Sequence, residues 1–414
     1  MRFFYRFQCF SALIFLSLFL GRTFTAYADF KLLDAIEEFG ERRYVKTKPS
    51  RIITGPVRWH PTLHSASTYD SNILLEHQDP HEDVFFNVQP GVIAELPINK
   101  HQIVVGYEAD FEMFSKSKDA RQNAQNQNFF TLADFRFTSW YANILERFSE
   151  TSGRSGTTFT QRIPRFDQSV QPKIGYHWKR FTVETGFRHF LRDFRHTVDN
   201  AFDFHETAWT GVLYYDLFAR LKALMEYQIS QMNYDHNHSR DGTFNQIRAG
   251  LEGELMPNLR VKARSGIQIR NYYKKSHTDF SSWVADIWVE YKIRPNFKLM
   301  SRMGLEPVEA TFGNVDYYLE SRYGFGFEYA PWLRWVLFAN FDYIRQGYAE
   351  RTVVDATDTR FRRDHYFNGR YGIRYLTNDW MQWELAYENL LRRSNFSDLQ
   401  YVDHRVSLSS TLSY

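Results

Sequence analysis

Four cationic side chains at even positions of one short segment offer the clearest binding chemistry in this sequence. They are Arg260, Lys262, Arg264 and Arg270. Successive side chains of an extended strand point to opposite faces, so these four would form one cationic stripe. Such a stripe could attract an acidic solute. The alternative is that neighbouring strands pair these charges with Glu252, Glu254 and Glu290 and so brace the structure.

Two other groups of residues have the types that metal binding or catalysis requires. Residues 235–238, Asp-His-Asn-His, supply two imidazoles, but we identify no third ligand. Ser407 shares a strand face with Asp403, whereas His404 points the other way, and a nucleophile needs its base on the same wall. The glycines form no phosphate-binding loop. We therefore expect no enzyme, no metal site and no other cofactor.

The stripe belongs to a strand pattern that recurs to the end of the chain. In the last segment, apolar residues keep one parity and polar residues the other, and the apolar side includes Val406, Leu408, Leu412 and Tyr414. One face of such a strand requires apolar surroundings and the other requires water. A strand of this kind that ends in an aromatic residue resembles the C-terminal assembly signal of Gram-negative outer-membrane barrels.

Short turns and longer loops alternate along the chain from Val57 onward. Eight turn signals recur about every 40 residues, with nine longer polar loops between them. The turn signals lie at residues 97–99, 138–139, 179–180, 218–220, 257–258, 295–296, 331–332 and 378–379. This spacing predicts an all-β fold, a transmembrane antiparallel up-and-down barrel of about 18 strands, with short periplasmic turns and longer extracellular loops.

A soluble sandwich or propeller is the alternative to a membrane barrel. Aromatic residues gather at strand ends, as Trp59, Trp140 and Trp178 do, and this is typical of membrane interfaces. The predicted inner face is heavily charged, which a dry sandwich core would not tolerate. These features favour the barrel. The register of residues 140–148 stays open, because Ile144 and Leu145 compete for the outer face.

The first residues predict export. Arg2 and Arg6 precede an apolar stretch, and Ala26-Tyr27-Ala28 forms a cleavage site, so residues 1–28 read as a signal peptide. Its removal takes away three arginines and leaves 48 basic against 48 acidic residues, which gives no support for nucleic-acid binding. No apolar segment beyond it is long enough for a spanning helix.

Three segments follow from this reading: the signal peptide 1–28, a periplasmic segment 29–56, and an outer-membrane barrel 57–414. Phe30, Leu32, Leu33, Ile36 and Phe39 recur at helical spacing. A short helix or tether is therefore expected before the barrel, and a plug inside the lumen is the alternative.

The first predicted hairpin carries a likeness to a known family. Three segments within residues 57–111 resemble the opening of the beta-barrel porin 2 family: residues 68–73, with Tyr69, Asp70 and Asn72, residues 88–92, with Pro90 and Gly91, and residues 101–107. The resemblance implies an outer-membrane protein associated with exopolysaccharide or capsule export, and it brings no catalytic residues. Each motif residue also has a structural reason, because Asn72 is a plausible turn former and Pro90-Gly91 a plausible kink.

The expected function is an outer-membrane conduit for exopolysaccharide or capsule secretion. A general porin for small hydrophilic solutes is the alternative, and a barrel-embedded hydrolase is a third candidate. The expected partners are outer-membrane lipids, the barrel assembly machinery through the C-terminal strand, and polysaccharide with periplasmic export components. Arg260, Lys262, Arg264 and Arg270 are the residues expected to guide the polymer.

Overall fold

The computed structural model describes residues 52–116, 123–152, 162–196, 199–274, 279–310, 315–353 and 359–414. The predicted signal peptide and most of segment 29–56 lie outside the described residues. The strands are β1 (Ile52–Thr54), β2 (Val57–Asp70), β3 (Asp83–Ile98), β4 (His101–Phe114), β5 (Ala124–Arg136), β6 (Trp140–Thr151), β7 (Arg165–Trp178), β8 (Phe181–Phe194), β9 (Phe204–Phe218), β10 (Leu221–Tyr234), β11 (Gly242–Met256), β12 (Leu259–Tyr272), β13 (Phe280–Arg294), β14 (Phe297–Glu309), β15 (Tyr317–Trp332), β16 (Trp335–Val353), β17 (Thr359–Leu376), β18 (Met381–Ser394) and β19 (Tyr401–Ser413).

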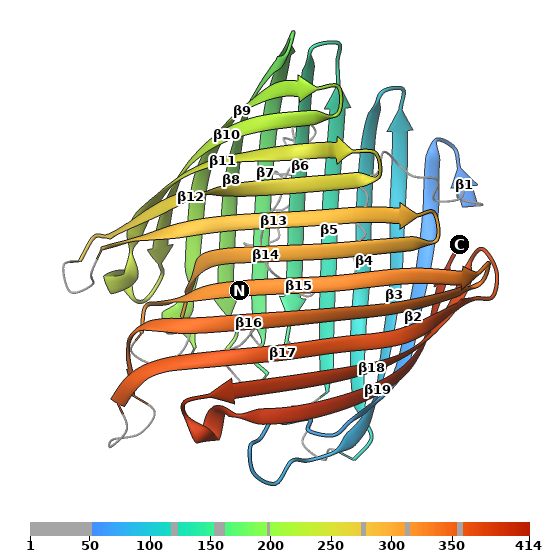
Figure 1. Cartoon of the computed structure of the whole chain (residues 1–414), viewed down its shortest axis with the longest axis vertical. Helices are drawn as coiled ribbons and strands as arrows, with labels where there is room; N and C mark the ends of the chain where they lie inside the picture. Colours follow the sequence, from blue (N-terminus) through green and yellow to red (C-terminus); the bar gives the residue numbers. More distant parts are fainter. Residues whose placement is uncertain are drawn as a thin grey trace, which may run out of the picture.

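Strands β2 to β19 form a closed antiparallel barrel. Each strand pairs with its neighbour in sequence, and β19 closes the cylinder against β2 from Arg405 opposite Asp70 to Ser413 opposite Thr62. In Figure 1 the strands of the two opposite walls cross in projection, because the strands of a barrel are tilted to its axis. The predicted eighteen-stranded barrel is confirmed.

The short strand β1 was not predicted. It pairs with the beginning of β2, Thr54 opposite Val57, beside the end of β19. The Tyr414 N–H donates to the Pro61 carbonyl at 3.1 Å, so the C-terminus and β1 share one edge of β2 (Figure 1). Three short 3-10 turns lie in the loops, and among the described residues no helix is long and apolar enough to cross a membrane.

Eight tight turns join the strands at one end of the barrel and nine longer loops join them at the other. Asn99, Lys179 and Asn258 have positive φ angles of 55°, 56° and 67° at three of these turns. The turn predicted at residues 331–332 lies two residues later, because β15 runs to Trp332 before the chain reverses. An even number of strands places both ends of the barrel on the side of the short turns, and in outer-membrane barrels that side faces the periplasm and the longer loops face the outside.

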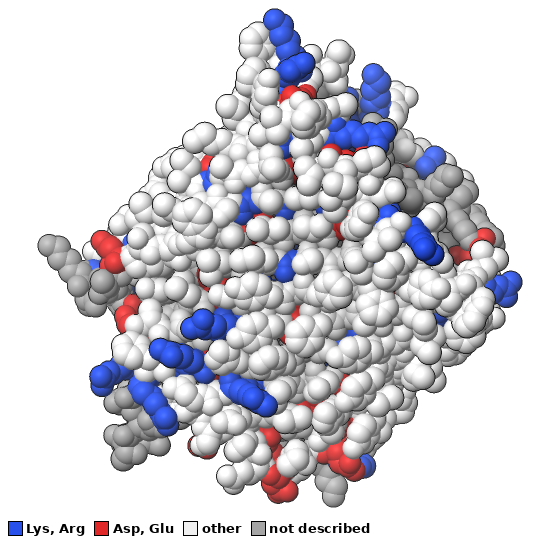
Figure 2. Space-filling model, viewed as in Figure 1, with Lys and Arg blue, Asp and Glu red and all other residues white. Residues whose placement is uncertain are grey.

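The two faces of the wall separate as the alternation predicted. Val406, Leu408 and Tyr414 are exposed on the outside, whereas Asp403, of the opposite parity, is fully buried inside. Figure 2 shows one side of the barrel on which uncharged atoms cover most of the middle and charged side chains gather mainly toward the edges. This outer surface suits lipid, and the barrel belongs to the bacterial outer membrane.

The open register of residues 140–148 is also settled. Leu145 points inward opposite Leu132 and is almost completely buried, and Ile144 points outward opposite Ala133. Periodicity could not decide this, because both faces of β6 carry an apolar side chain at mid-strand.

Candidate functional site in the lumen

The inner wall of β10 to β12 holds a compact network of ion pairs around Glu226. The Arg248 Nε donates to Glu226 Oε1 at 2.9 Å, and Arg264 Nη1 donates to the other carboxylate oxygen at 2.9 Å. Arg264 also reaches Glu252 at 3.1 Å. Arg264 crosses the intervening strand β11 to contact Glu226 on β10. The two arginines are thus held by acids on neighbouring strands, and the charges along this wall are largely compensated.

The four predicted guiding cations lie on one inward face of β12, but they differ in their exposure and in the groups that surround them. Arg260 lies 3.8 Å from Glu254, and Lys262 stands opposite Trp288. Arg270 is buried, pairs with Glu309 on β14, and lies between the rings of Phe244 and Phe280, at 5.2 and 5.8 Å. Arg270 therefore braces the wall, whereas Arg260, with a side chain 42% exposed, still faces the lumen.

Arg270 and Glu309 belong to a larger cluster of side chains at the loop end of the lumen, which also includes Arg240 and Tyr234. Arg240, in the β10–β11 loop, donates from its two Nη atoms to the Ala310 and Val315 carbonyls, each at 2.7 Å, and its Nε lies 3.3 Å from Asp316. Because these partners belong to the β14–β15 loop, the β10–β11 loop bridges the inner rim over β12 and β13. The Tyr234 hydroxyl adds a 2.9 Å hydrogen bond to Glu309.

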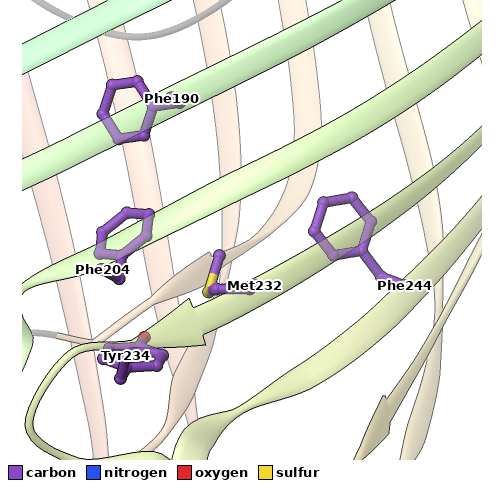
Figure 3. Packing of buried hydrophobic residues seen from close by; sticks show 5 residues of the cluster. All are labelled: Phe190, Phe204, Met232, Tyr234 and Phe244. Atoms are coloured by element: carbon purple, nitrogen blue, oxygen red, sulfur yellow. The ribbon is translucent and has the colours of Figure 1, made fainter. Parts of the chain in front are cut away.

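Aromatic side chains continue this cluster along β8 to β11. Five buried apolar residues face one another from these four strands (Figure 3), and they are Phe190, Phe204, Met232, Tyr234 and Phe244. The Arg192 guanidinium lies over two of their rings, at 5.4 Å from Phe190 and 5.8 Å from Phe204. Stacked guanidinium and aromatic groups can present both apolar and cationic surface to a solute that enters from outside.

A glycine allows one ion pair to cross a whole strand. Arg302 on β14 reaches Asp342 on β16 through two hydrogen bonds of 3.1 and 2.8 Å, over Gly324 of β15. A Cβ atom at Gly324 would lie 2.5 Å from the Arg302 side chain and 2.6 Å from the Asp342 carboxylate. The absence of a side chain therefore leaves room for the pair.

One part of the inner wall departs from the charged pattern. Val104, Phe130, Leu132 and Leu145 point inward from β4, β5 and β6, and each is at most 3% exposed. The Phe130 ring covers Gly106 on the adjacent strand, where any Cβ would collide with it. The heavily charged inner face that parity predicted is interrupted here by an apolar patch, because these strands carry apolar residues at both parities.

Two residues of the family-like motif, Asp70 and Asn72, lie at the loop end of the seam between β2 and β19. Asn72 is almost completely buried; its amide nitrogen donates to the Glu76 and Val402 carbonyls at 2.8 and 3.1 Å, and its oxygen accepts the Glu76 N–H at 2.9 Å. Asp70 lies 3.0 Å from Arg405. Asn72 therefore organises the first loop, and together with Asp70 it holds the seam.

The other motif residues have similarly local contacts. The Tyr69 hydroxyl donates to Glu82 at 2.7 Å. Pro90 stands opposite Leu63, and a Cβ at Gly91 would lie 2.6 Å from the Thr62 hydroxyl oxygen. Each of these contacts has a structural explanation and none by itself indicates a transported solute.

The histidines of residues 235–238 pair with separate acids. His236 lies 3.7 Å from Asp203, and His238 lies 3.1 Å from Asp241. Burial raises the pKa of the Asp203 carboxyl, although the Phe194 N–H donates to it at 2.6 Å. Among the described residues, no group of three or more His, Cys, Asp or Glu side chains is arranged to hold a metal ion.

Comparison with known proteins gives similarity to solved structures only. No protein-family model and no curated protein matches the sequence. The match to the outer-membrane protein OpdK of Pseudomonas aeruginosa covers 86% of this chain and 99% of OpdK, with 8% identity and a TM-score of 0.47. The match to OpdO of P. aeruginosa covers 86% of this chain and 97% of OpdO, with 12% identity and a TM-score of 0.47. The match to the siderophore receptor PirA of P. aeruginosa covers 86% of this chain and 80% of PirA, with 10% identity and a TM-score of 0.46.

The assignment of this chain therefore rests on its own geometry. Its wall is closed, its outer face is apolar, and its inner face carries charges of both signs. A closed barrel leaves no strand edge unpaired in the membrane, and eighteen strands are enough to enclose an aqueous channel. The chain is an eighteen-stranded β-barrel of the bacterial outer membrane.

Proposed function

We propose that this barrel is a passive channel for small hydrophilic solutes. The observation that carries the proposal is the pairing of charge along the inner wall, as in the Arg264, Glu226 and Glu252 network. Paired charges leave a polar wall with little net field, which solvates small solutes of either sign. The cluster of Arg240 and Arg270 at the loop end would then set which solutes enter.

Two measurements test this function. The purified barrel in a planar bilayer should give steady ionic conductance, and vesicles that contain it should admit small sugars but exclude oligosaccharides above a size limit. Arg260→Gln with Lys262→Gln should shift the reversal potential in a salt gradient toward cation preference, because two lumen cations are lost. Arg180→Gln with Arg294→Gln, at the exposed periplasmic turns, is the matched control. The absence of conductance in correctly folded protein contradicts the proposal.

A second proposal is the export of exopolysaccharide or capsule, for which the same barrel would need periplasmic export partners. Its support is the family resemblance within residues 57–111 and the inward row of Arg260, Lys262 and Arg264 on β12. Because Glu226 and Glu252 compensate Arg264, this row attracts an acidic polymer less than its sequence alone suggests. Deletion of the gene should trap polymer in the periplasm, and unchanged surface polysaccharide contradicts export.

Both proposals describe a channel that does not catalyse a reaction. A screen of the folded protein for lipid and peptide hydrolysis separates them from a barrel-embedded hydrolase. Turnover that persists in independently purified preparations would overturn the channel proposals in favour of an enzyme.

A further inference from the structure

Three arginines on the outer face of β16 to β18 differ from most arginines of this barrel. Arg345, Arg363 and Arg393 have the outward parity and are exposed. Inward arginines such as Arg264 and Arg302 have carboxylate partners. Within the described part of the chain, by contrast, the three outward side chains form no ion pair.

The ladder register brings these cations together. Arg345 of β16 stands opposite His365 of β17, which stands opposite Arg393 of β18. Directly opposite Cβ atoms lie about 4.5–5.5 Å apart, and Arg363, two residues along β17, is diagonal to both arginines. Figure 2 shows basic side chains gathered toward the lower left, where Figure 1 places the loop ends of β15 to β18. The three arginines stand diagonally or two strands apart, close enough for their positive charges to repel one another, and an anion among them would offset this repulsion.

The height of this row on the barrel is given by the aromatic side chains beside it. Tyr343 precedes Arg345 by two residues on the same face, and Phe367 follows His365 by two. The two rings are 5.0 Å apart, and the Tyr343 hydroxyl is hydrogen bonded with His365 Nδ1 at 2.8 Å. Aromatic rings of this kind occupy the boundary between hydrocarbon and headgroups, so the arginines just beyond them lie at headgroup level on the extracellular side.

We infer that Arg345, Arg363 and Arg393, with His365, bind the phosphate groups of a phosphorylated lipid of the outer leaflet. Guanidinium groups bind phosphate in a bidentate manner, and three of them around one position can share the oxygens of one or two phosphates. A membrane lipid fits better than a soluble protein partner, because the site continues directly into the apolar and aromatic surface below it. Acyl chains on Tyr343 and Phe367 would place the headgroup on the arginines.

This site is separate from the lumen and does not depend on the transported solute. It requires only the orientation of the barrel, with the loops outside. Arg345→Gln, Arg363→Gln and Arg393→Gln should be combined in one variant. Lys100→Gln, Arg180→Gln and Arg294→Gln, which remove three exposed cations at the opposite end, form the control variant.

The measurement is the binding of bisphosphorylated lipid A to the detergent-solubilised full barrel, followed by native mass spectrometry. The triple outer variant should bind about a hundredfold more weakly than wild type, since each arginine near an anionic surface contributes roughly a factor of five. The control variant should bind phosphorylated lipid A with the affinity of wild type. Lipid A without phosphates should bind wild type about a hundredfold more weakly than phosphorylated lipid A does, which is the same loss as in the triple outer variant. Heat-modifiable migration on gels checks that every variant is folded.

Three outcomes would overturn the inference. Equal affinity of wild type and outer variant would show that the arginines are not the site. An equal loss in the control variant would show a general charge effect. Full competition by inorganic phosphate would show a site for free phosphate instead of a lipid. Should the triple variant fail to fold, Arg393→Gln alone serves, with an expected fivefold loss.

Discussion

Replacement of Glu226 by glutamine tests whether the lumen charges stabilise the wall. The Glu226 side chain is 3% exposed and accepts hydrogen bonds from Arg248 and Arg264, whose side chains are 18% and 25% exposed. Glutamine keeps the shape but leaves the guanidinium groups of Arg248 on β11 and Arg264 on β12 beside each other without the carboxylate that held both. Removal of one partner from a buried ion pair costs roughly 3–5 kcal/mol. Because both arginines retain some contact with water and Arg264 keeps Glu252, we expect a loss of about 2–4 kcal/mol.

Glu252→Gln is the matched control for this change. It removes one negative charge from the adjacent strand, but the Glu252 side chain is 34% exposed and, within the described segments, pairs with Arg264 alone, at 3.1 Å. Exposed pairs of this kind contribute about 0–1 kcal/mol. The two variants should therefore shift the reversal potential in a salt gradient in the same direction, toward anions, while only Glu226→Gln lowers stability strongly.

The assay is guanidinium unfolding of the barrel refolded in phospholipid vesicles, followed by tryptophan fluorescence. A loss of 2–4 kcal/mol corresponds to a change of roughly 30- to 700-fold in the unfolding equilibrium constant. Equal midpoints and slopes for Glu226→Gln and Glu252→Gln would refute the reasoning, because burial would then make no difference to these pairs.

Three further changes give distinct outcomes. Gly372→Ala should destabilise by about 1–3 kcal/mol in the same unfolding assay, since its Cβ would lie 2.5 Å from the Phe338 ring and 2.6 Å from a backbone carbonyl, whereas Gly211→Ala has open space and should be neutral or slightly stabilising. Asn72→Ala removes two hydrogen bonds to Glu76 within the first loop and one to Val402 across the seam, and it should cost about 2–3 kcal/mol; an unchanged midpoint would contradict its role. Deletion of Tyr414 should slow assembly in cells, measured as the fraction of heat-modifiable barrel, if the C-terminal strand is the segment that the assembly machinery binds.

The alternation of side chains predicted the barrel because a membrane wall imposes opposite solvents on its two faces. On β19 the difference between Leu408 and Ser409 is large, so parity alone determines the orientation. On β6 the difference disappears, since Ile144 and Leu145 are both apolar, and only pairing with β5 decides which of them points inward. Local pattern is informative only where the two faces differ.

The candidate site was less predictable for a similar reason. The inward position of Arg260, Lys262, Arg264 and Arg270 followed from parity, but their partners depend on register and on contacts between strands that are not neighbours. Glu309 illustrates this, because the sequence predicts a polar loop over residues 307–313, whereas β14 extends to Glu309, which pairs with Arg270. The Arg240 contacts depend on where one loop lies against another, and no spacing in the sequence gives this.

The seam between β2 and β19 has a consequence for the order in which the chain can fold. The Ser71 hydroxyl donates to Asp403 across 332 residues of sequence, and Asn72 reaches Val402 across 330. Closing a free loop of that length costs about 5 kcal/mol of chain entropy, more than these few contacts return. The intervening hairpins must therefore pair first and carry the two edges toward each other. Until β19 pairs with β2, each of these two strands has an unpaired edge that could pair with another chain.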